Sequence, residues 1–217
     1  MLPYRILDLP ENPLNNLPLV IEKNKFRTNQ TDDPYSIIEP NILKRDIISR
    51  FSDLGLDIEF VVVFKTYMIP YGGIKSRMIH SDIHCNGNQW RSIPFAVNWE
   101  IGPNKLGLFR WYNMDLCEKI YPPEHQKNSP KFSRLSGIHY QQWRNNGIPV
   151  DAVEIASTYT NRPLLVRTDL PHLVLYRGLG RMAMSLRFKQ DLTWDEAVER
   201  LDSMVVKVGF EPTTITV

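Results

Sequence analysis

The chain has 217 residues, of which 42% are hydrophobic and 23% charged, a composition ordinary for one soluble globular domain with a substantial core. Its formal net charge of +2 is too small to indicate nucleic acid or an anionic membrane as a partner. Two cysteines, Cys85 and Cys117, do not make a disulfide framework, which favours a reducing, cytoplasmic compartment. No apolar run approaches membrane-spanning length, and the N-terminus lacks the pattern of a signal peptide.

Residues 1–57 are predicted to form an extended, proline-rich arm followed by one helix. The helix is predicted over 39–57, because Pro40 suits a first turn, apolar residues repeat along one face, and Gly55 is a plausible stop. The apolar face consists of Leu43, Ile47, Phe51 and Leu54.

The region 58–190 is predicted to be the β-rich core, because short segments rich in β-branched and aromatic residues alternate with turn signals. The predicted strands are 58–69, 92–102, 105–113, 150–158, 162–169, 172–178 and 181–188. The sequence Gly-Pro-Asn-Lys joins the second and third of these strands and is predicted to be a hairpin connection.

Residues 115–147 are polar and show no sustained periodicity, so they are predicted to form a long loop, since typical connections have about 4–6 residues. Basic and aromatic residues interleave there, a pattern that can bind nucleic acid, but the small net charge ranks that partner below peptides and small molecules. Residues 191–217 are predicted to contain a closing helix, because Thr193 and Glu196 form a capping box. The whole chain is therefore predicted to be one domain, mainly β with flanking helices.

The stretch 80–84, His-Ser-Asp-Ile-His, concentrates potential metal ligands after the first strong strand. On an extended strand these three side chains would face one way, so one hypothesis is a zinc site made of His80, Asp82 and His84. A Gly-Asn pair shortly afterwards indicates that the chain turns away, which would leave His84 outside the ligand set.

The stretch 181–188 predicts a strand with one polar and one apolar face. The polar face consists of Arg181, Ala183, Ser185 and Arg187, and the apolar face of Met182, Met184, Leu186 and Phe188. Two inward-pointing arginines would destabilise a packed core, but they suit a barrel whose interior holds an anionic ligand. His172 opens the preceding predicted strand directly after a proline.

The order of these motifs resembles that of the Fe(II)/2-oxoglutarate-dependent oxygenases over roughly residues 58–190. A His-x-Asp follows an early core strand, a lone histidine begins a late strand, and an arginine lies on the next strand. The segment RTDLPHLV…RMAMSLRF is especially similar to prolyl- and aspartyl/asparaginyl-hydroxylase-like members. The resemblance implies a double-stranded β-helix, that is, a jelly roll or cupin-like barrel.

The resemblance also implies the ligands of the site. His80, Asp82 and His172 match the two-histidine, one-carboxylate set that binds Fe(II) and leaves three positions open for 2-oxoglutarate and O2. Arg181 matches the arginine that holds the distal carboxylate of 2-oxoglutarate. Arg187 is either a second carboxylate contact or part of a buried structural pair.

A further candidate cofactor contact is Asn98, which alternation places on the same strand face as Ala96 and Glu100. Structural hydrogen bonding is the alternative role for this side chain. On the same part of the chain, Trp111 and Tyr112 are predicted to be core aromatics rather than substrate contacts.

The function implied by the resemblance is hydroxylation of a peptidyl side chain or a small molecule, with succinate and CO2 as co-products. Asp82 favours hydroxylation or demethylation, because the resembling halogenases replace that carboxylate. Two other hypotheses remain at this stage: a non-catalytic cupin-like module that binds a metal or ligand, and a zinc-dependent enzyme that uses His80, Asp82 and His84. The sequence sets neither the substrate nor an oligomeric state.

Overall fold

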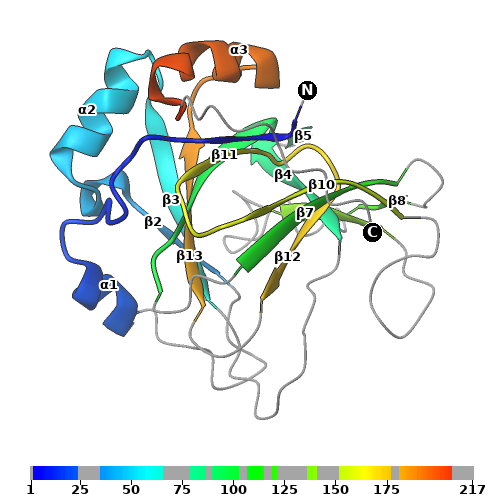
Figure 1. Ribbon diagram of the computed structural model, residues 1–217, viewed down its shortest axis with the longest axis horizontal. Coiled ribbons are helices and arrows are strands. Elements are labelled where there is room, and N and C mark those ends of the chain that lie inside the picture. Colours follow the sequence, from blue (N-terminus) through cyan, green and yellow to red (C-terminus); the bar gives the residue numbers. More distant parts are fainter. Residues whose placement is uncertain are drawn as a thin grey trace.

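Two antiparallel sheets form the centre of the molecule in the computed structural model (Figure 1). The structure describes residues 2–23, 35–65, 79–86, 89–102, 107–114, 119–121, 136–140, 152–176 and 181–206. The prediction of a mainly β fold with flanking helices is confirmed. None of the helices in these ranges has the length and apolar character that crossing a bilayer requires.

The first sheet has six strands and carries both the first and the last strand of the predicted core. Its order is β1 (Tyr4–Ile6), β11 (Leu164–Arg167), β6 (Phe95–Glu100), β13 (Met182–Phe188), β3 (Ile58–Lys65) and β2 (Tyr35–Ile38). The strands predicted from 58–69, 162–169 and 181–188 are thereby confirmed within the described part of the chain.

The second sheet has seven strands and faces the first. Its order is β10 (Val153–Tyr159), β7 (Gly107–Asn113), β12 (His172–Tyr176), β4 (His80–Asn86), β9 (Ser136–Tyr140) and β8 (Lys119–Ile120), with β5 (Gln89–Ser92) paired to β4. The predicted strands 150–158 and 172–178 are confirmed, whereas β4 and β5 were not predicted as strands.

The predicted hairpin between β6 and β7 is wrong, because these strands lie in different sheets. β6 pairs with β11 and β13, while β7 pairs with β10 and β12. Both strands bury side chains on both faces, so each is enclosed by partners that come from much later in the chain. A short connection between two strands therefore crosses from one sheet to the other here.

The prediction of one unstructured loop over 115–147 is also wrong in part, because β8 and β9 lie inside it. β9 pairs with β4 and β8 pairs with β9, so this segment extends the second sheet. Such short strands are held by main-chain hydrogen bonds to a distant partner, which no side-chain period reveals. Apart from the exposed Tyr121, the other residues of the predicted loop lie outside the described part of the chain.

The N-terminal region is more regular than the predicted arm. β1 and β2 are the two edges of the first sheet, and α1 (Leu17–Lys23) lies between them in sequence. The predicted helix over 39–57 is α2 (Arg45–Asp53), and Pro40 instead begins a short 3-10 turn. The stop at Gly55 is confirmed, since this residue has a φ of +69°, a conformation that glycine adopts without strain.

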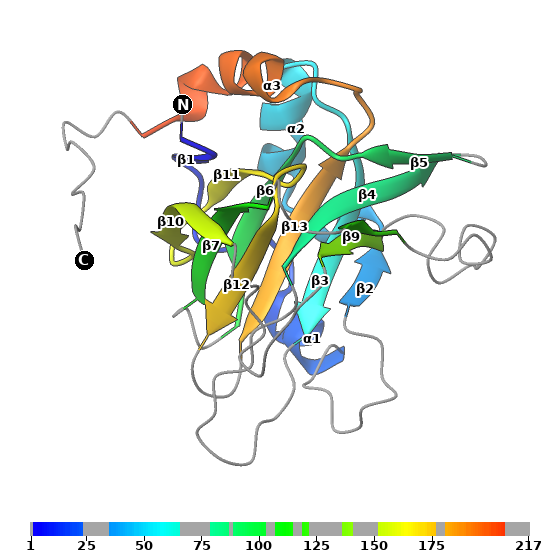
Figure 2. The same cartoon turned by 90° about the vertical axis from the view of Figure 1, so that its right-hand side faces the viewer.

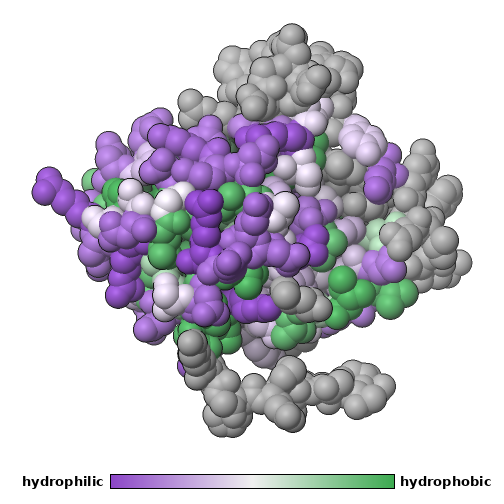
Figure 3. All heavy atoms as spheres, turned by 90° about the horizontal axis from the view of Figure 1, so that it is seen from above, coloured by the Kyte–Doolittle hydropathy of each residue, from purple (hydrophilic) through white to green (hydrophobic). Residues whose placement is uncertain are grey.

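Helices cover the outer face of the six-stranded sheet (Figures 1 and 2). Ile47 and Phe51 of α2 are fully buried there against Val61, Met184 and other apolar residues of the sheet. α3 (Trp194–Arg200) adds Trp194 to the same cluster. Seen from above, the described surface at this helical end is mostly hydrophilic, as expected for helices with one apolar face (Figure 3).

The inner faces of the two sheets meet in a second apolar cluster. This cluster consists of Ala96, Phe109, Trp111, Leu164 and Val166. The burial of Trp111 and of the neighbouring Tyr112 confirms that both are core aromatics. The predicted alternation of β13 is confirmed as well, because its methionines join the core under the helices while its polar face points between the sheets.

We expect the α3 capping box to contribute measurably to stability. Thr193 accepts a hydrogen bond from the main-chain N–H of Glu196 at 3.3 Å, and Glu196 accepts one from the N–H of Thr193 at 2.7 Å. Thr193→Ala should lower the free energy of unfolding by about 1 kcal/mol in urea denaturation. Thr193→Ser keeps the hydroxyl and should stay within about 0.5 kcal/mol of the parent. An alanine variant as stable as the parent would contradict the role of the cap.

Candidate metal centre and pocket

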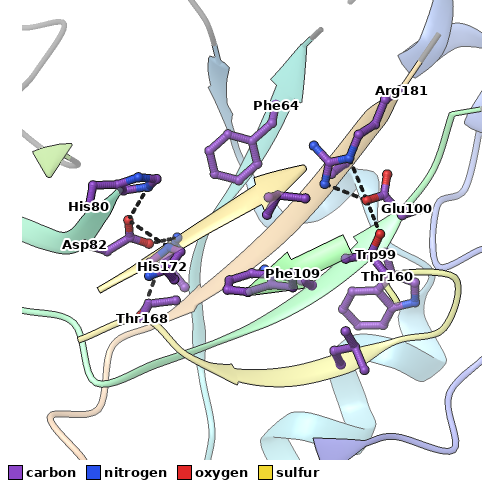
Figure 4. Close-up of a pocket in the computed structure, with 15 residues that line it drawn as sticks. Phe64, His80, Asp82, Trp99, Glu100, Phe109, Thr160, Thr168, His172 and Arg181 are labelled. Atoms are coloured by element: carbon purple, nitrogen blue, oxygen red, sulfur yellow. Dashed lines mark hydrogen bonds and ion pairs between the residues drawn. The ribbon is translucent and has the colours of Figure 1, made fainter. Parts of the chain in front are cut away.

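A pocket lies between the two sheets and encloses about 650 Å³, including open space at its mouth (Figure 4). His80, Asp82 and His172 lie at one end, and a second polar cluster lies at the opposite end. Between the two ends the labelled side chains are aromatic, with Phe64 and Phe109 facing the space. The pocket is therefore polar at both ends and apolar in the middle.

Two neighbouring strands bring the first cluster together. His80 begins β4 and His172 begins β12, and the two residues are direct partners in the antiparallel ladder. Nε2 of His80 lies 3.5 Å from Oδ1 of Asp82, and Nε2 of His172 lies 3.9 Å from the same oxygen. One ligand atom from each of the three residues lies within 4.8 Å of the other two. The fold thus gathers two imidazole nitrogens and one carboxylate oxygen at one point.

An arginine from the other sheet fixes the carboxylate. Nη2 of Arg187 on β13 donates a hydrogen bond of 2.6 Å to Oδ2 of Asp82, and both residues are buried. Because Arg187 takes Oδ2, the histidines face Oδ1. Asp82 is therefore arranged to offer a metal ion one oxygen rather than two. Of the two roles left open for Arg187, the structure shows a buried ion pair.

The protonation states of the cluster suit metal binding. Burial by itself would raise the pKa of Asp82, but the positive charge of Arg187 and the two nearby imidazoles outweigh it, so the pKa is lowered. Burial also lowers the pKa of His172, against the opposing effect of Asp82. Asp82 is thus charged and His172 neutral near neutral pH, which are the forms that bind metals.

A main-chain contact orients the His172 ring. Nδ1 of His172 lies 2.8 Å from the carbonyl oxygen of Leu170, and since a carbonyl only accepts, Nδ1 carries the proton. Nε2 consequently has its lone pair directed to the Asp82 side. Phe109 stacks on the ring, with the two ring centres 5.0 Å apart, and limits its rotation. Such support of a ligating histidine is typical of metal sites.

The opposite end of the pocket contains a buried ion pair that the sequence did not predict. Arg181, the residue before β13, donates to Oε1 of Glu100 from Nε at 2.8 Å and from Nη2 at 2.5 Å. The hydroxyl of Thr160 donates to the same oxygen at 2.7 Å. Alternation placed Glu100 on the pocket face, but no local signal linked it to Arg181, and nothing indicated Thr160.

A glycine makes room for this ion pair. A Cβ on Gly107 would lie 2.2 Å from Oγ1 of Thr160 and 2.8 Å from Oε1 of Glu100. Any larger residue at this position would therefore push the cluster apart. Gly107, which begins β7, is therefore part of the site, because the absence of a side chain there leaves room for Thr160 and Glu100 to meet.

Asn98 lies on the pocket face together with Glu100, as alternation predicts. Its Oδ1 is buried and has no hydrogen-bond partner among the described residues. Ser185, which lies opposite Asn98 in the ladder between β6 and β13, also buries an oxygen without such a partner. Asn98 therefore lines the pocket, and its role as a cofactor contact stays a prediction.

His84 does not join the cluster. β4 pairs with β12 at His80 alone, and by Ile83 it pairs with β5 instead, so the strand turns away from the pocket. The ring of His84 lies beside Phe60, in a separate cavity on the far side of Arg187. Within the ranges that the structure describes, the group able to hold a metal contains His80, Asp82 and His172, without His84. The geometry therefore gives no support to the zinc hypothesis based on residues 80, 82 and 84.

No protein-family model, curated protein or solved structure matches the chain. The function is therefore inferred from the geometry and chemistry of the pocket rather than from relatives.

Replacement of the distant histidine tests the proposed ligand set. His172→Ala removes one of three convergent donors and should weaken binding of Mn²⁺ or anaerobic Fe²⁺ by more than about 100-fold in calorimetric titration. His84→Ala is the matched control and should leave the metal affinity unchanged. The opposite pattern, with His84 required and His172 dispensable, would contradict the cluster described above.

Proposed function

We propose that the protein is an Fe(II)- and 2-oxoglutarate-dependent dioxygenase with a jelly-roll core, which hydroxylates a peptidyl side chain or a small molecule. Fe(II) held by His80, Asp82 and His172, together with 2-oxoglutarate and O2, would supply the oxidising chemistry, with succinate and CO2 as co-products. The observation that carries this proposal is the position of three convergent ligand atoms at one end of a pocket whose other end holds Arg181.

The order of the strands supports a jelly-roll core. Eight strands, β3, β4, β6, β7, β10, β11, β12 and β13, form the two facing halves of the sandwich. The first, third, sixth and eighth of them lie in one sheet, and the second, fourth, fifth and seventh lie in the other. An antiparallel eight-stranded double sheet of this kind is expected for a jelly roll.

The ligand set fits Fe(II) and does not fit a structural zinc site. Two imidazoles and one monodentate carboxylate on one side of an ion, with the other side open to a cavity, are typical of non-haem Fe(II) oxygenases. A structural zinc site would be closed by four protein ligands. The described cluster offers three residues, and it lines the wall of an open pocket.

The charges of the pocket support a dianionic co-substrate. Among the described residues that line it, the positive charges of Arg181 and Arg187 equal the negative charges of Asp82 and Glu100. With neutral imidazoles, a bound divalent ion would leave the pocket with a charge of +2, which one molecule of 2-oxoglutarate would cancel. A buried site is most stable when its charges balance in this way.

Each residue then has a distinct task. Arg187 holds Oδ2 of Asp82, and Leu170 and Phe109 hold the His172 ring. Nε and Nη2 of Arg181 both donate to Glu100. Another nitrogen of the guanidinium points away from Glu100, toward the space beside Phe64 (Figure 4). We assign to this nitrogen the distal carboxylate of 2-oxoglutarate. The aromatic middle of the pocket would exclude water around the carbon chain.

Anaerobic reconstitution tests this function directly. Addition of 2-oxoglutarate to the Fe(II) protein should produce a weak visible charge-transfer band, and admission of air should release succinate slowly even without substrate. Metal binding without band or succinate would instead support the non-catalytic, ligand-binding alternative.

Arg181→Ala should weaken 2-oxoglutarate binding by about 10- to 100-fold, because it removes a charge-assisted contact, and should leave metal affinity intact. Arg110→Ala is the control, since Arg110 pairs with Glu154 and does not line the pocket. Calorimetric titration of the Mn²⁺ protein measures both affinities. An unchanged 2-oxoglutarate affinity in Arg181→Ala would contradict the role assigned to Arg181.

A further inference from the structure

The two arginines at the ends of the β13 pocket face are each paired with a carboxylate from another strand. Arg187 is paired with Asp82 of β4, and Arg181 is paired with Glu100 of β6. The first pair has a clear role beside the metal ligands. The second lies where the proposed function places a carboxylate of the co-substrate, so the protein already contains a carboxylate at that position.

Arg181 and Thr160 hold the carboxylate of Glu100 in place through one of its oxygens. This oxygen accepts hydrogen bonds from Nε and Nη2 of Arg181 and from Thr160. Glu100 is 4% exposed and Arg181 is 7% exposed, so water screens their interaction little. The absence of a side chain at Gly107 leaves room for this arrangement.

From this geometry we infer that Glu100 is an internal competitor that sets a low affinity for the co-substrate carboxylate at Arg181. The inference rests on the proposed function. An incoming carboxylate either displaces Glu100 from Arg181 or binds beside it and meets its negative charge. In both cases the co-substrate gains only part of the attraction that an unpaired arginine would offer.

The opposite role for Glu100 is that of a support that turns Arg181 toward the co-substrate. The two roles predict opposite signs for one substitution. Glu100→Gln keeps an oxygen that accepts from Arg181 and Thr160 but removes the negative charge. A competitor replaced in this way gives tighter co-substrate binding, whereas a support that needs its charge gives weaker binding.

The stability of the protein without ligand provides a second readout. In Glu100→Gln the buried Arg181 loses the negative charge of Glu100, so the melting temperature of the protein without co-substrate should fall. Binding of 2-oxoglutarate would restore a counter-charge and should raise the melting temperature by more than in the parent. A lower stability combined with a higher affinity is not the result of simple structural damage.

The experiment is a calorimetric titration of 2-oxoglutarate into the Mn²⁺ protein. Glu100→Gln should lower Kd by about tenfold or more, as expected for removing one charge several ångströms from the ligand in a poorly screened site. Glu100→Asp keeps the charge but withdraws it from Arg181, and it should lower Kd by a smaller factor. Glu154→Gln makes the same chemical change at an ion pair outside the pocket and should leave Kd unchanged.

The outcomes separate this inference from the function on which it rests. If the parent binds 2-oxoglutarate and both Glu100 variants bind it equally or more weakly, the competitor role is wrong and the oxygenase proposal stands. If the Mn²⁺ form of the parent does not bind 2-oxoglutarate at all, both the proposed function and the role of Glu100 are wrong.

Discussion

The ion pair between Arg187 and Asp82 is the interaction on which the rest of the site depends. It joins the two sheets at the end of the pocket where Asp82 lies with His80 and His172, because Arg187 belongs to β13 and Asp82 to β4. It also keeps a buried carboxylate charged and directs one oxygen to the histidines. Loss of one partner from such a buried pair typically costs about 3–5 kcal/mol, so the arrangement is tied to the stability of the fold.

Side chains on β13 alternate between two faces, so the strand both packs the core and lines the pocket. Its methionines pack under the helices, and its other face carries a guanidinium at each end of the pocket. Since these groups are six positions apart on an extended strand, their backbones are separated by about 20 Å, which gives the pocket two distinct polar ends. One guanidinium is paired with Asp82 of the candidate metal centre, and the other, paired with Glu100, is the group that we propose for the co-substrate carboxylate.

Local patterns in the sequence predicted the features that depend on side-chain period. The alternation along 181–188 and the capping box at Thr193 are of this kind, and both appear in the structure. The features that the sequence missed depend on which strands meet across the sandwich. The separation of β6 and β7 into different sheets, and the meeting of Glu100 with Arg181, arise from long-range pairing that neighbouring residues do not encode.

The most direct test of the account is a crystal structure of the protein with Mn²⁺ and 2-oxoglutarate, prepared without oxygen. The account predicts a metal ion bonded to Nε2 of His80, Nε2 of His172 and Oδ1 of Asp82, with the far carboxylate of 2-oxoglutarate against Arg181. A metal ion bound by other residues, or 2-oxoglutarate located outside the space between the two sheets, would contradict it.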